Sequence, residues 1–358
     1  MTCVPDGIAS ATARHITRHI TRHITRHITH RILVAIAGVA ASGAVLGAQR
    51  QPPAPAAAQS PASTSTRPAG GALQQLLDGE LARFPGTAGI WVKHLTTGEE
   101  AGVRADVSFN SASVIKIPVL VLAMQLADRG VLSLRDRITI TADDVRGGSG
   151  VLRYHDAGLQ PTLRDVLLQM IITSDNTATD LAIAKVGGVA AVNTWLAANG
   201  QGEALSLTMT TGELFAKYAT LPDRAASNAR TIGDRRYWLG AMTPRATGRM
   251  IEAMQRCADG TVTAPLIAAT ASCTDMMRMM RAQQSGARRL PHFLDVPVAH
   301  KTGDFPPVVA NDVGVIYTAS GPVVVAFFSN DIRGSYGEAE DLIGRTAQRI
   351  VEYFGRRP

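Results

Sequence analysis

The sequence lacks any stripe of basic residues interleaved with aromatic side chains after residue 50, and it contains few charged residues overall. Only 5% of the 358 residues are aromatic and 18% are charged, whereas 46% are hydrophobic. The formal charge of +7 is misleading, because six arginines and one acidic residue fall within residues 1–50 and leave about +2 for the rest. We therefore expect no nucleic-acid partner. The length and composition are typical of a soluble globular protein with a sizeable core.

Cysteine is also scarce. The chain has Cys3 near its start and Cys257 and Cys273 in its body. In an oxidising compartment, Cys257 and Cys273 could pair across the short loop between them. Two free, buried thiols are the alternative, since spacing in the sequence does not supply the geometry that a disulfide requires. Both interpretations stay open at this point.

The first 48 residues have the pattern of a targeting segment. Residues 32–48 form an apolar run rich in small residues, and a basic stretch precedes it. This order predicts a secretory signal peptide with cleavage near Ala44 or Ala48. An uncleaved anchor is the weaker alternative, because a run of this length is marginal for a membrane span.

The basic stretch repeats a four-residue unit, "RHITRHITRHITRHIT", over residues 14–29. Its histidines would line one helical face and could bind a metal there; they are His15, His19, His23 and His27. A low-complexity leader is the interpretation that we adopt. We expect no metal site and no organic cofactor in the mature protein.

Residues 49–71 are rich in Pro, Ala, Ser and Thr and have almost nothing to bury, so they predict a flexible linker. The chain is thus expected to comprise a leader over 1–48, this linker, and one folded domain over 72–358. We expect the domain to be periplasmic or secreted and monomeric, with membrane contact only through the signal segment.

Apolar spacing gives the elements of the folded domain. It predicts helices over 71–84, 114–127, 162–173, 177–185, 189–198, 243–256, 273–283 and 336–355. It predicts strands over 87–95, 101–106, 296–303, 311–319 and 321–329, with a hairpin turn at Gly98. Strands at both chain ends with helices between them indicate an α+β fold, an α/β sandwich. One antiparallel sheet built from both chain ends would pack against a mainly helical portion.

The segment "SASVIKIPVL" combines an apolar surround with Ser113 and Lys116, which would lie one helical turn apart. A serine hydroxyl is a weak nucleophile that needs a base within hydrogen-bond reach. Burial would lower the pKa of Lys116 and make a neutral amine plausible. The motif S-x-x-K alone is weak, because short helices contain it by chance.

Two further motifs strengthen this interpretation. "TSDNTAT" places Ser174, Asp175 and Asn176 at a break between helices, and "VAHKTGD" places Lys301, Thr302 and Gly303 at the end of a strand. Lys301 and Thr302 would supply a carboxylate-binding edge, and Gly303 would permit close approach of a substrate. The trio in this order is typical of class A β-lactamases and penicillin-binding proteins.

The chain resembles the penicillin-recognising serine enzymes, and among them the class A β-lactamase-related branch, over roughly residues 72 to 356. The resemblance implies that Ser113 is acylated, that Lys116 accepts its proton, and that Ser174 passes a proton to the leaving nitrogen. It also implies that Asn176 holds the amide side chain of the substrate.

The resemblance further assigns the substrate carboxylate to Lys301 and Thr302, and an oxyanion hole to the backbone amides of Ser113 and Asp304, which follows Gly303. The implied activity is β-lactam hydrolysis without a cofactor. The closest alternative is an enzyme acting on D-alanyl peptides of peptidoglycan or on small esters, which β-lactams acylate but which deacylates slowly. A non-catalytic ligand-binding protein with the same fold is the third.

Two departures from the family pattern affect these expectations. Class A enzymes place a glutamate in the loop after the SDN motif, but Thr210 and Thr211 stand at the expected place here. Glu213 is the nearby carboxylate, and we interpret it as a solvated loop residue. Asp304 would place negative charge beside a carboxylate site, unless Arg or Lys pairs with it. The sequence shows no clear second arginine for that site.

Three other polar residues receive structural interpretations. We expect His300 to be packed or hydrogen-bonded on its strand and Asp312 to serve a turn or a cap. Tyr154 could border the cleft, and covering the core is an equal alternative.

Overall fold

The computed structural model describes residues 70–261 and 267–355. The signal segment, the histidine repeat and the linker up to residue 69 therefore lie outside the described residues, and their assignments stay predictions.

Each end of the described chain contributes a helix and strands, as the apolar spacing predicted, and most of the helices lie between them. The helices are α2 Gly70–Ala82, α3 Lys116–Asp128, α4 Leu163–Ile172, α5 Asn176–Lys185, α6 Gly188–Ala198, α7 Thr211–Ala219, α8 Arg224–Gly233, α9 Pro244–Ala258, α10 Thr270–Arg281 and α11 Tyr336–Gly355. The strands are β1 Thr87–His94, β2 Glu100–Val103, β3 Phe109–Asn110, β4 Leu205–Leu207, β5 Gly240–Met242, β6 Val298–Phe305, β7 Val309–Thr318 and β8 Gly321–Asn330. Short 3₁₀ turns are η1 Ala112–Ile115, η2 Ala142–Asp144, η3 Leu152–Tyr154 and η4 Arg235–Tyr237.

The main sheet joins the two ends of the chain. Its strand order is β2-β1-β8-β7-β6, and every pairing is antiparallel. β1 pairs with β8 in a register that sets Ile90 against Phe327. β1 and β8 are rich in apolar residues because both faces of the sheet are covered. The sequence-based prediction of an α+β fold with one sheet from both termini is confirmed.

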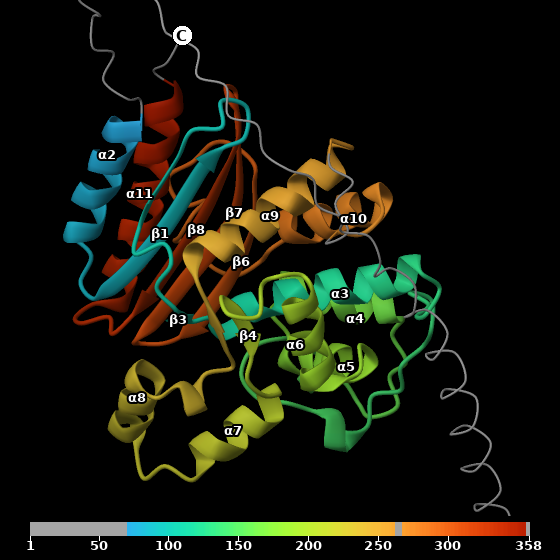
Figure 1. Ribbon diagram of the computed structural model, residues 1–358. Helices are drawn as coiled ribbons and strands as arrows, with labels where there is room; N and C mark the ends of the chain where they lie inside the picture. The colour runs from blue at the N-terminus through green and yellow to red at the C-terminus, as the bar shows by residue number, and fades with distance from the viewer. Residues whose placement is uncertain (1–69, 262–266, 356–358) are drawn as a thin grey trace, which may run out of the picture. The chain divides into compact units, whose positions relative to one another are not determined.

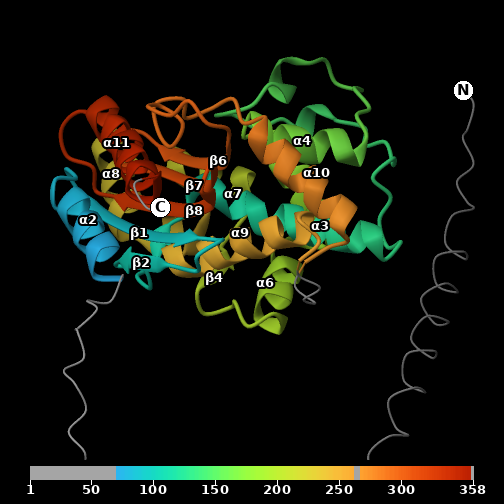
Figure 2. The same ribbon diagram turned by 90° about the horizontal axis from the view of Figure 1, so that it is seen from above.

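Helices cover the two faces of this sheet unequally. α2 and α11 lie together on one face (Figures 1 and 2), where side chains such as Leu77, Phe327 and Ile350 form one apolar cluster. α9 lies on the opposite face, and α10 packs beside α9. Beyond them stands the helical portion that contains α3 to α7 (Figure 1).

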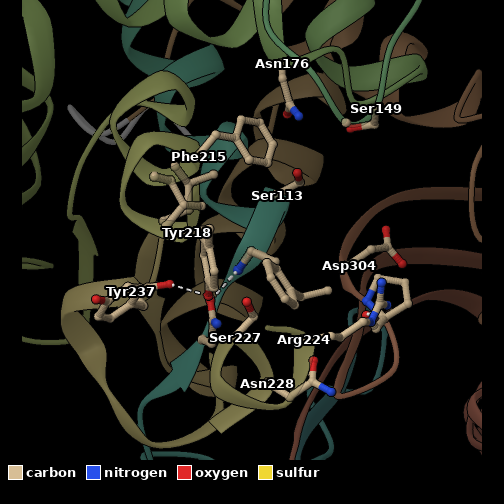
Figure 3. A pocket seen from close by; sticks show the side chains of 17 residues that line it. Ser113, Ser149, Asn176, Phe215, Tyr218, Arg224, Ser227, Asn228, Tyr237 and Asp304 are labelled. Carbon is tan, nitrogen blue, oxygen red and sulfur yellow. Dashed lines mark hydrogen bonds between the residues drawn. The ribbon is translucent and has the colours of Figure 1, made fainter. Parts of the chain in front are cut away.

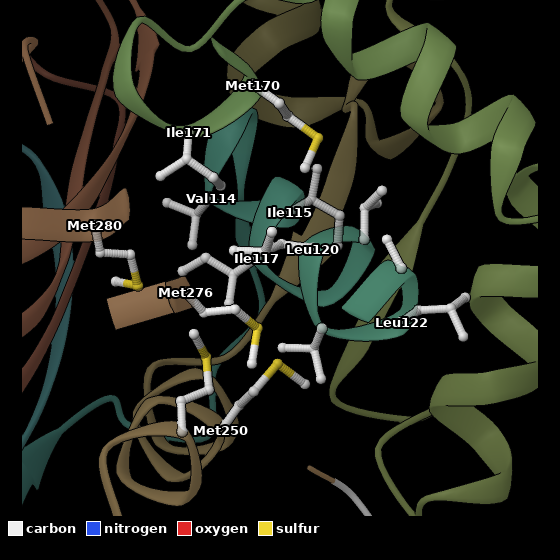
Figure 4. Close-up of a cluster of buried hydrophobic side chains, with 14 of the residues drawn as sticks. Val114, Ile115, Ile117, Leu120, Leu122, Met170, Ile171, Met250, Met276 and Met280 are labelled. Atoms are coloured by element: carbon white, nitrogen blue, oxygen red, sulfur yellow. The ribbon is translucent and has the colours of Figure 1, made fainter. Parts of the chain in front are cut away.

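α3 runs through the centre of the helical portion. Ten consecutive residues from Lys116 to Gln125 are buried, which confirms the prediction of a core helix. Neighbouring helices pack around it, with Met170 from α4 and Met276 from α10 among the contacts (Figure 4). The methionine pairs of α10 thus fill the core.

Several local elements differ from the sequence-based predictions. Ser113 lies on the 3₁₀ turn η1 and not within an α-helix, so α3 itself begins at Lys116. A second sheet of order β3-β5-β4 was not predicted, because each strand has only two or three residues. α7 and α8 were also missed, since residues 211–233 contain few apolar positions at helical spacing.

Cys257 and Cys273 form a disulfide with a Cα–Cα distance of 5.8 Å, which joins the end of α9 to α10. The structure therefore favours the first of the two alternatives that the sequence left open. Among the described residues, no single helix is long and apolar enough to cross a membrane; α5 and α6 meet that test only as a pair bent by 70°.

Candidate active site

Ser113 stands on η1, between the main sheet and the helical portion. It lines a cavity of about 700 Å³ to which the η1 turn, the loop after η2, α7, α8 and the end of β6 contribute (Figure 3). The preceding Ala112 has φ of 42°, a left-handed backbone that is uncommon outside glycine. Over the described part of the chain, the hydroxyl of Ser113 makes no hydrogen bond and faces the cavity. It is thus free to meet a ligand.

Lys116 is fully buried behind this cavity. Its Nζ donates to the backbone oxygen of Ser174 at 2.7 Å, to Ser174 Oγ at 3.1 Å and to Asn176 Oδ1 at 3.0 Å. Burial, and after it the positive charge of Lys301, lowers the pKa of Lys116 well below its usual range. The geometry therefore brings Lys116 against the SDN motif and favours a neutral amine at a lower pH than for an exposed lysine.

Ser174 forms the meeting point of the two lysines. Its Oγ also accepts a hydrogen bond from Lys301 Nζ at 3.0 Å. Lys301 is fully buried on β6, and burial lowers its pKa to about 8 against the opposing effect of Asp304 and Asp312. Ser174 has a left-handed φ of 55° in the short turn between α4 and α5. Its hydroxyl lies within hydrogen-bond distance of both amines.

Asn176 borders the cavity at the start of α5 (Figure 3). Its Oδ1 accepts from Lys116, and its Nδ2 donates to the backbone oxygen of Gly147 at 2.9 Å. Ser149, from the same loop as Gly147, donates to the backbone oxygen of Ser174 at 2.7 Å and also lines the cavity. The glycine-rich loop therefore fixes the SDN turn from outside.

Gly150 allows that close approach. A Cβ at this position would lie 2.2 Å from the Oδ2 of Asp175, which itself accepts from the backbone amide of Leu152. The middle residue of the SDN motif is thus a structural anchor that caps α5 and holds the loop.

Thr302 and Gly303 lie beside Lys301 but not on the cavity surface. Thr302 is fully buried, and its hydroxyl shares a hydrogen bond of 2.7 Å with Ser285 Oγ. A Cβ on Gly303 would lie 2.4 Å from the backbone oxygen of Ser111, so this glycine lets β6 approach the η1 turn. The close neighbour is thus the protein's own backbone, whereas the sequence analysis had expected a substrate.

Asp304 lines the cavity and forms an ion pair with Arg289. The guanidinium of Arg289 is almost entirely buried and also binds Glu340 at 2.9 Å and the backbone oxygen of Asn311 at 2.9 Å. Tyr336 donates to the same carboxylate oxygen of Asp304 at 3.2 Å. Asp304 therefore has a cationic partner, Arg289, which precedes it by 15 positions in the sequence.

Glu213 does not point into the cavity. Its carboxylate accepts from the backbone amide of Thr210 at 2.8 Å and from Thr210 Oγ1 at 3.1 Å, a capping box at the start of α7. The sequence-based interpretation of Glu213 as a loop residue was therefore wrong, because it lies in the first turn of α7; its side chain is exposed and does not line the cavity. α7 presents Leu214, Phe215 and Tyr218 to the cavity.

Thr211 is one of the two threonines at the place where class A enzymes have their glutamate. Its hydroxyl donates to Asp180 Oδ1 at 2.8 Å, and its backbone amide donates to the same oxygen at 2.7 Å. Asp180 also binds Arg146 at 2.8 Å. The carboxylate of Asp180 is thus held by backbone amides and by Arg146. Among the described residues, Asp304 is the only one with a carboxylate that lines the cavity.

The sequence patterns did not identify several residues that line the cavity or bind a residue that does. Arg289 has a weak signal, in that "GARRLP" precedes β6 with two adjacent arginines. Ser149 follows two glycines in "GGSG", which marks a loop of close backbone approach. Nothing in the sequence distinguishes the cavity residues of α8.

The three residues given structural interpretations also have defined surroundings. His300 Nδ1 lies 2.8 Å from Asp312 Oδ1, and Asp312 also accepts from the backbone amide of Leu290. Tyr154 is 73% exposed and stacks with Arg153, so it neither lines the cavity nor covers the core. In the part of the chain that the structure describes, no group of three or more His, Cys, Asp or Glu residues could hold a metal ion.

Comparison with known proteins gives matches along most of the chain. Residues 71–354 match the family model described as "Beta-lactamase enzyme family". A β-lactamase of Mycobacterium tuberculosis (strain ATCC 25177 / H37Ra) is 30% identical over 280 residues, which cover 77% of this chain and 83% of that protein. β-Lactamase L2 of Stenotrophomonas maltophilia is 33% identical over 123 residues, and this shorter match spans 34% of this chain and 40% of that protein.

The fold is also similar to that of solved structures. The crystal structure of a β-lactamase from Sphaerobacter thermophilus DSM 20745 superposes with a TM-score of 0.65 at 29% sequence identity. The superposition covers 80% of this chain and 97% of that one.

Proposed function

We propose that this chain, which belongs to the β-lactamase enzyme family, hydrolyses β-lactams through an acyl-serine intermediate on Ser113. Family membership supports the hydrolysis of β-lactams as the activity class. The observation that carries the finer proposal is the convergence of Lys116 and Lys301 on the hydroxyl of Ser174 behind the cavity that exposes Ser113.

In the proposed acylation, Ser113 Oγ attacks the lactam carbonyl carbon and its proton passes to Lys116 Nζ. The carbonyl oxygen becomes an oxyanion that the backbone amides of Ser113 and Asp304 stabilise. The C–N bond then breaks, and the leaving nitrogen takes the proton of the Ser174 hydroxyl. Lys116, which donates to that hydroxyl at 3.1 Å, returns the proton to Ser174.

Substrate binding is assigned to the groups next to this relay. Lys301, charged below about pH 8, would attract the substrate carboxylate, with Thr302 beside it. Asn176 Nδ2 would exchange its bond to Gly147 for one to the amide of the substrate. Each of these roles rests on position and charge in the site.

Deacylation is the step for which the site is least equipped. A water molecule that attacks the acyl-enzyme needs a general base, which typically contributes about 10²–10⁴ in rate. The cavity-facing residues of α7 include no carboxylate, and Asp304 is neutralised by Arg289. We therefore propose that deacylation limits turnover.

This observation also favours the second candidate, a D-alanyl peptidase or an esterase that β-lactams acylate and that releases them slowly. Its natural substrate would be a peptidoglycan-derived peptide or a small ester. The two candidates share Ser113, Lys116 and Ser174 and differ in the rate of the second step.

Intact-mass kinetics with a chromogenic cephalosporin test the proposal. The mature domain is expected to gain the mass of the cephalosporin on Ser113 and to lose it again with continuing colour release. A persistent adduct with negligible turnover would favour the second candidate. No adduct and no turnover would refute both.

Ser113→Ala is the control for the acylation site. It removes only the nucleophile, so it should bind the cephalosporin without any covalent adduct. Equal hydrolysis by this variant would contradict the assignment.

We also propose that the domain acts in the periplasm or outside the cell. The disulfide between Cys257 and Cys273 supports an oxidising compartment. Fractionation of expressing cells, with the N-terminal mass of the recovered protein, tests this. A cytoplasmic protein that retains residues 1–48 would refute it.

A further inference from the structure

The cavity at Ser113 continues well past the groups used in acylation, toward α8. Figure 3 shows Tyr218, Tyr237, Ser227, Asn228 and Arg224 along this extension, at a distance from Asn176 and Ser149. We call this extension the α8 arm, defined by Tyr218, Arg224, Asn228, Tyr237 and Phe305. None of the roles described above uses it.

Rigid aromatic side chains form the walls of the α8 arm. The rings of Tyr218 and Phe305 lie 4.8 Å apart between centroids, and those of Tyr218 and Tyr237 lie 5.5 Å apart. The Tyr218 hydroxyl is engaged, since it shares a hydrogen bond with Thr231 Oγ1 at 2.6 Å and donates to the backbone oxygen of Tyr237 at 3.0 Å. The walls therefore offer apolar ring faces to a ligand.

The far end of the α8 arm is polar and has unused hydrogen-bonding groups. Arg224 donates one hydrogen bond, from Nη2 to the backbone oxygen of Pro306 at 2.7 Å, and forms no ion pair with any described carboxylate. That bond fixes the guanidinium at the cavity while its other N–H groups stay available. Asn228 Oδ1 is buried and has no hydrogen-bond partner in the described part of the chain.

A buried acceptor without a donor is destabilising, so Asn228 is suited to a ligand N–H group. Arg224 is suited to a carboxylate, which accepts several of its donors at once. A ligand that carries both groups at one end would satisfy both residues.

The direction of the arm identifies which part of a substrate would enter it. In the proposed function, Ser174 and Lys301 serve the leaving nitrogen and the substrate carboxylate, and both lie outside the cavity lining, on the side of Asn176. The part of the substrate that remains is the acyl side chain. The arm begins at Ser113, where the acyl carbon would be bound.

We propose that the α8 arm binds the acyl side chain of the substrate, and that it selects an extended chain ending in a carboxylate with an N–H group beside it. This inference rests on the proposed function, because it deepens the substrate class of the same site. The chain would pass over the rings of Tyr218 and Phe305, which contact each other and line the cavity, and end at Arg224 and Asn228.

Three cephalosporins with one nucleus and six-carbon acyl chains test the proposal: hexanoyl, adipoyl and α-aminoadipoyl. The measurement is the second-order rate constant of Ser113 acylation by intact mass. We expect adipoyl to exceed hexanoyl by about tenfold, and α-aminoadipoyl to equal or exceed adipoyl, as charge-assisted hydrogen bonds at a partly exposed site would give.

Arg224→Gln should abolish the preference for adipoyl over hexanoyl. Arg230→Gln is the matched control, since Arg230 lies on the same helix but pairs with Asp234 and does not line the cavity. Asn228→Leu should remove any advantage of α-aminoadipoyl over adipoyl. The equilibrium affinities of Ser113→Ala for the three compounds should follow the same order, independently of acylation.

Equal acylation by hexanoyl and adipoyl, or a preference that survives Arg224→Gln, would overturn the inference and leave the proposed function intact. If Arg224→Gln and Arg230→Gln lost the preference for adipoyl equally, the preference would come from the general positive charge of this surface. That result would overturn the specific site. Failure of all three compounds to acylate Ser113 would overturn the proposed function and this inference with it.

Discussion

Lys301 Nζ donates a hydrogen bond to Ser174 Oγ at 3.0 Å, although the two residues are 127 positions apart in the sequence. The same oxygen accepts from Lys116. One hydroxyl therefore joins the helical portion to the sheet at the point where two buried amines would otherwise repel each other. A change at this hydroxyl should affect both amines.

Replacing Ser174 with Ala should abolish proton transfer to the leaving nitrogen while preserving the fold. The acylation rate constant is expected to fall by about 10²–10⁴, the range for loss of a positioned acid–base group. Stopped-flow acylation and a thermal unfolding curve provide the measurement. Thr173→Ala is the control, because the Thr173 hydroxyl bonds only within its own helix. Equal effects of the two substitutions would contradict a relay role for Ser174.

The rate of acylation should depend on pH with two limbs. Burial lowers the pKa of Lys301 to about 8, so this side chain loses its charge and its attraction for a carboxylate as pH rises through 8. The lowered pKa of Lys116 sets the acid limb, because protonation removes the proton acceptor as pH falls through that pKa. Rates from pH 5 to 10 should therefore pass through a maximum.

Lys301→Arg separates the two limbs, since arginine keeps its charge throughout this range. The alkaline limb should disappear in this variant and the acid limb should remain. An unchanged alkaline limb would assign that limb to another group.

Asp304→Asn should strengthen the binding of substrates that carry a carboxylate near Lys301. The substitution removes the charge that neutralises Arg289 and keeps the side-chain size, while Glu340 still pairs with the guanidinium. The KM for a penicillin is expected to fall by about tenfold, as one additional charge-assisted contact would give. A higher KM would mean that Asp304 holds Arg289 in place and does not oppose the substrate.

Glu213→Gln should leave deacylation unchanged. Its carboxylate caps α7 through Thr210, so the expected cost is below about 1 kcal/mol in the free energy of unfolding. Single-turnover loss of the acyl adduct, measured beside urea unfolding, checks both values. Marked slowing of deacylation alone would show that Glu213 reaches the acyl group during turnover.

Loss of the disulfide should destabilise the domain without changing its chemistry. Cys257 and Cys273 are separated by 16 positions, for which chain-entropy arguments give about 3 kcal/mol. Urea unfolding of the double variant Cys257→Ala/Cys273→Ala should show this loss, with the acylation rate retained. An unchanged midpoint would mean that packing between α9 and α10 suffices.

The sequence predicted the parts of the fold whose pattern is long. α11 carries an apolar face over several turns, whereas α3 is apolar on all sides and too long for a strand. β7 and β8 are Val-rich runs of strand length, so composition and length identified them. β3, β4 and β5 have two or three residues each, too few for any period. α8 is largely polar and makes few core contacts, so it has no apolar stripe to detect.

The candidate site divides in the same way. Ser113, Lys116, Ser174, Asn176 and Lys301 were recognisable because short motifs carry them. Hydrogen bonds join the last four, and Ser113 lines the same cavity as Asn176. Arg289 was not recognisable, because its contact with Asp304 depends on how a loop returns to β6. Contacts of this kind follow from tertiary packing and have no local signature.

The order β2-β1-β8-β7-β6 places β1, which is made early in synthesis, between β2, which follows it directly, and β8, which is made near the end. β1 has no permanent neighbour on one side until residues 321–330 have left the ribosome. The main sheet therefore cannot be completed until the last part of the chain, which contains β8, has been synthesised. A chain that stays unfolded until its last strands are made can still pass through an export channel that accepts only unfolded chains.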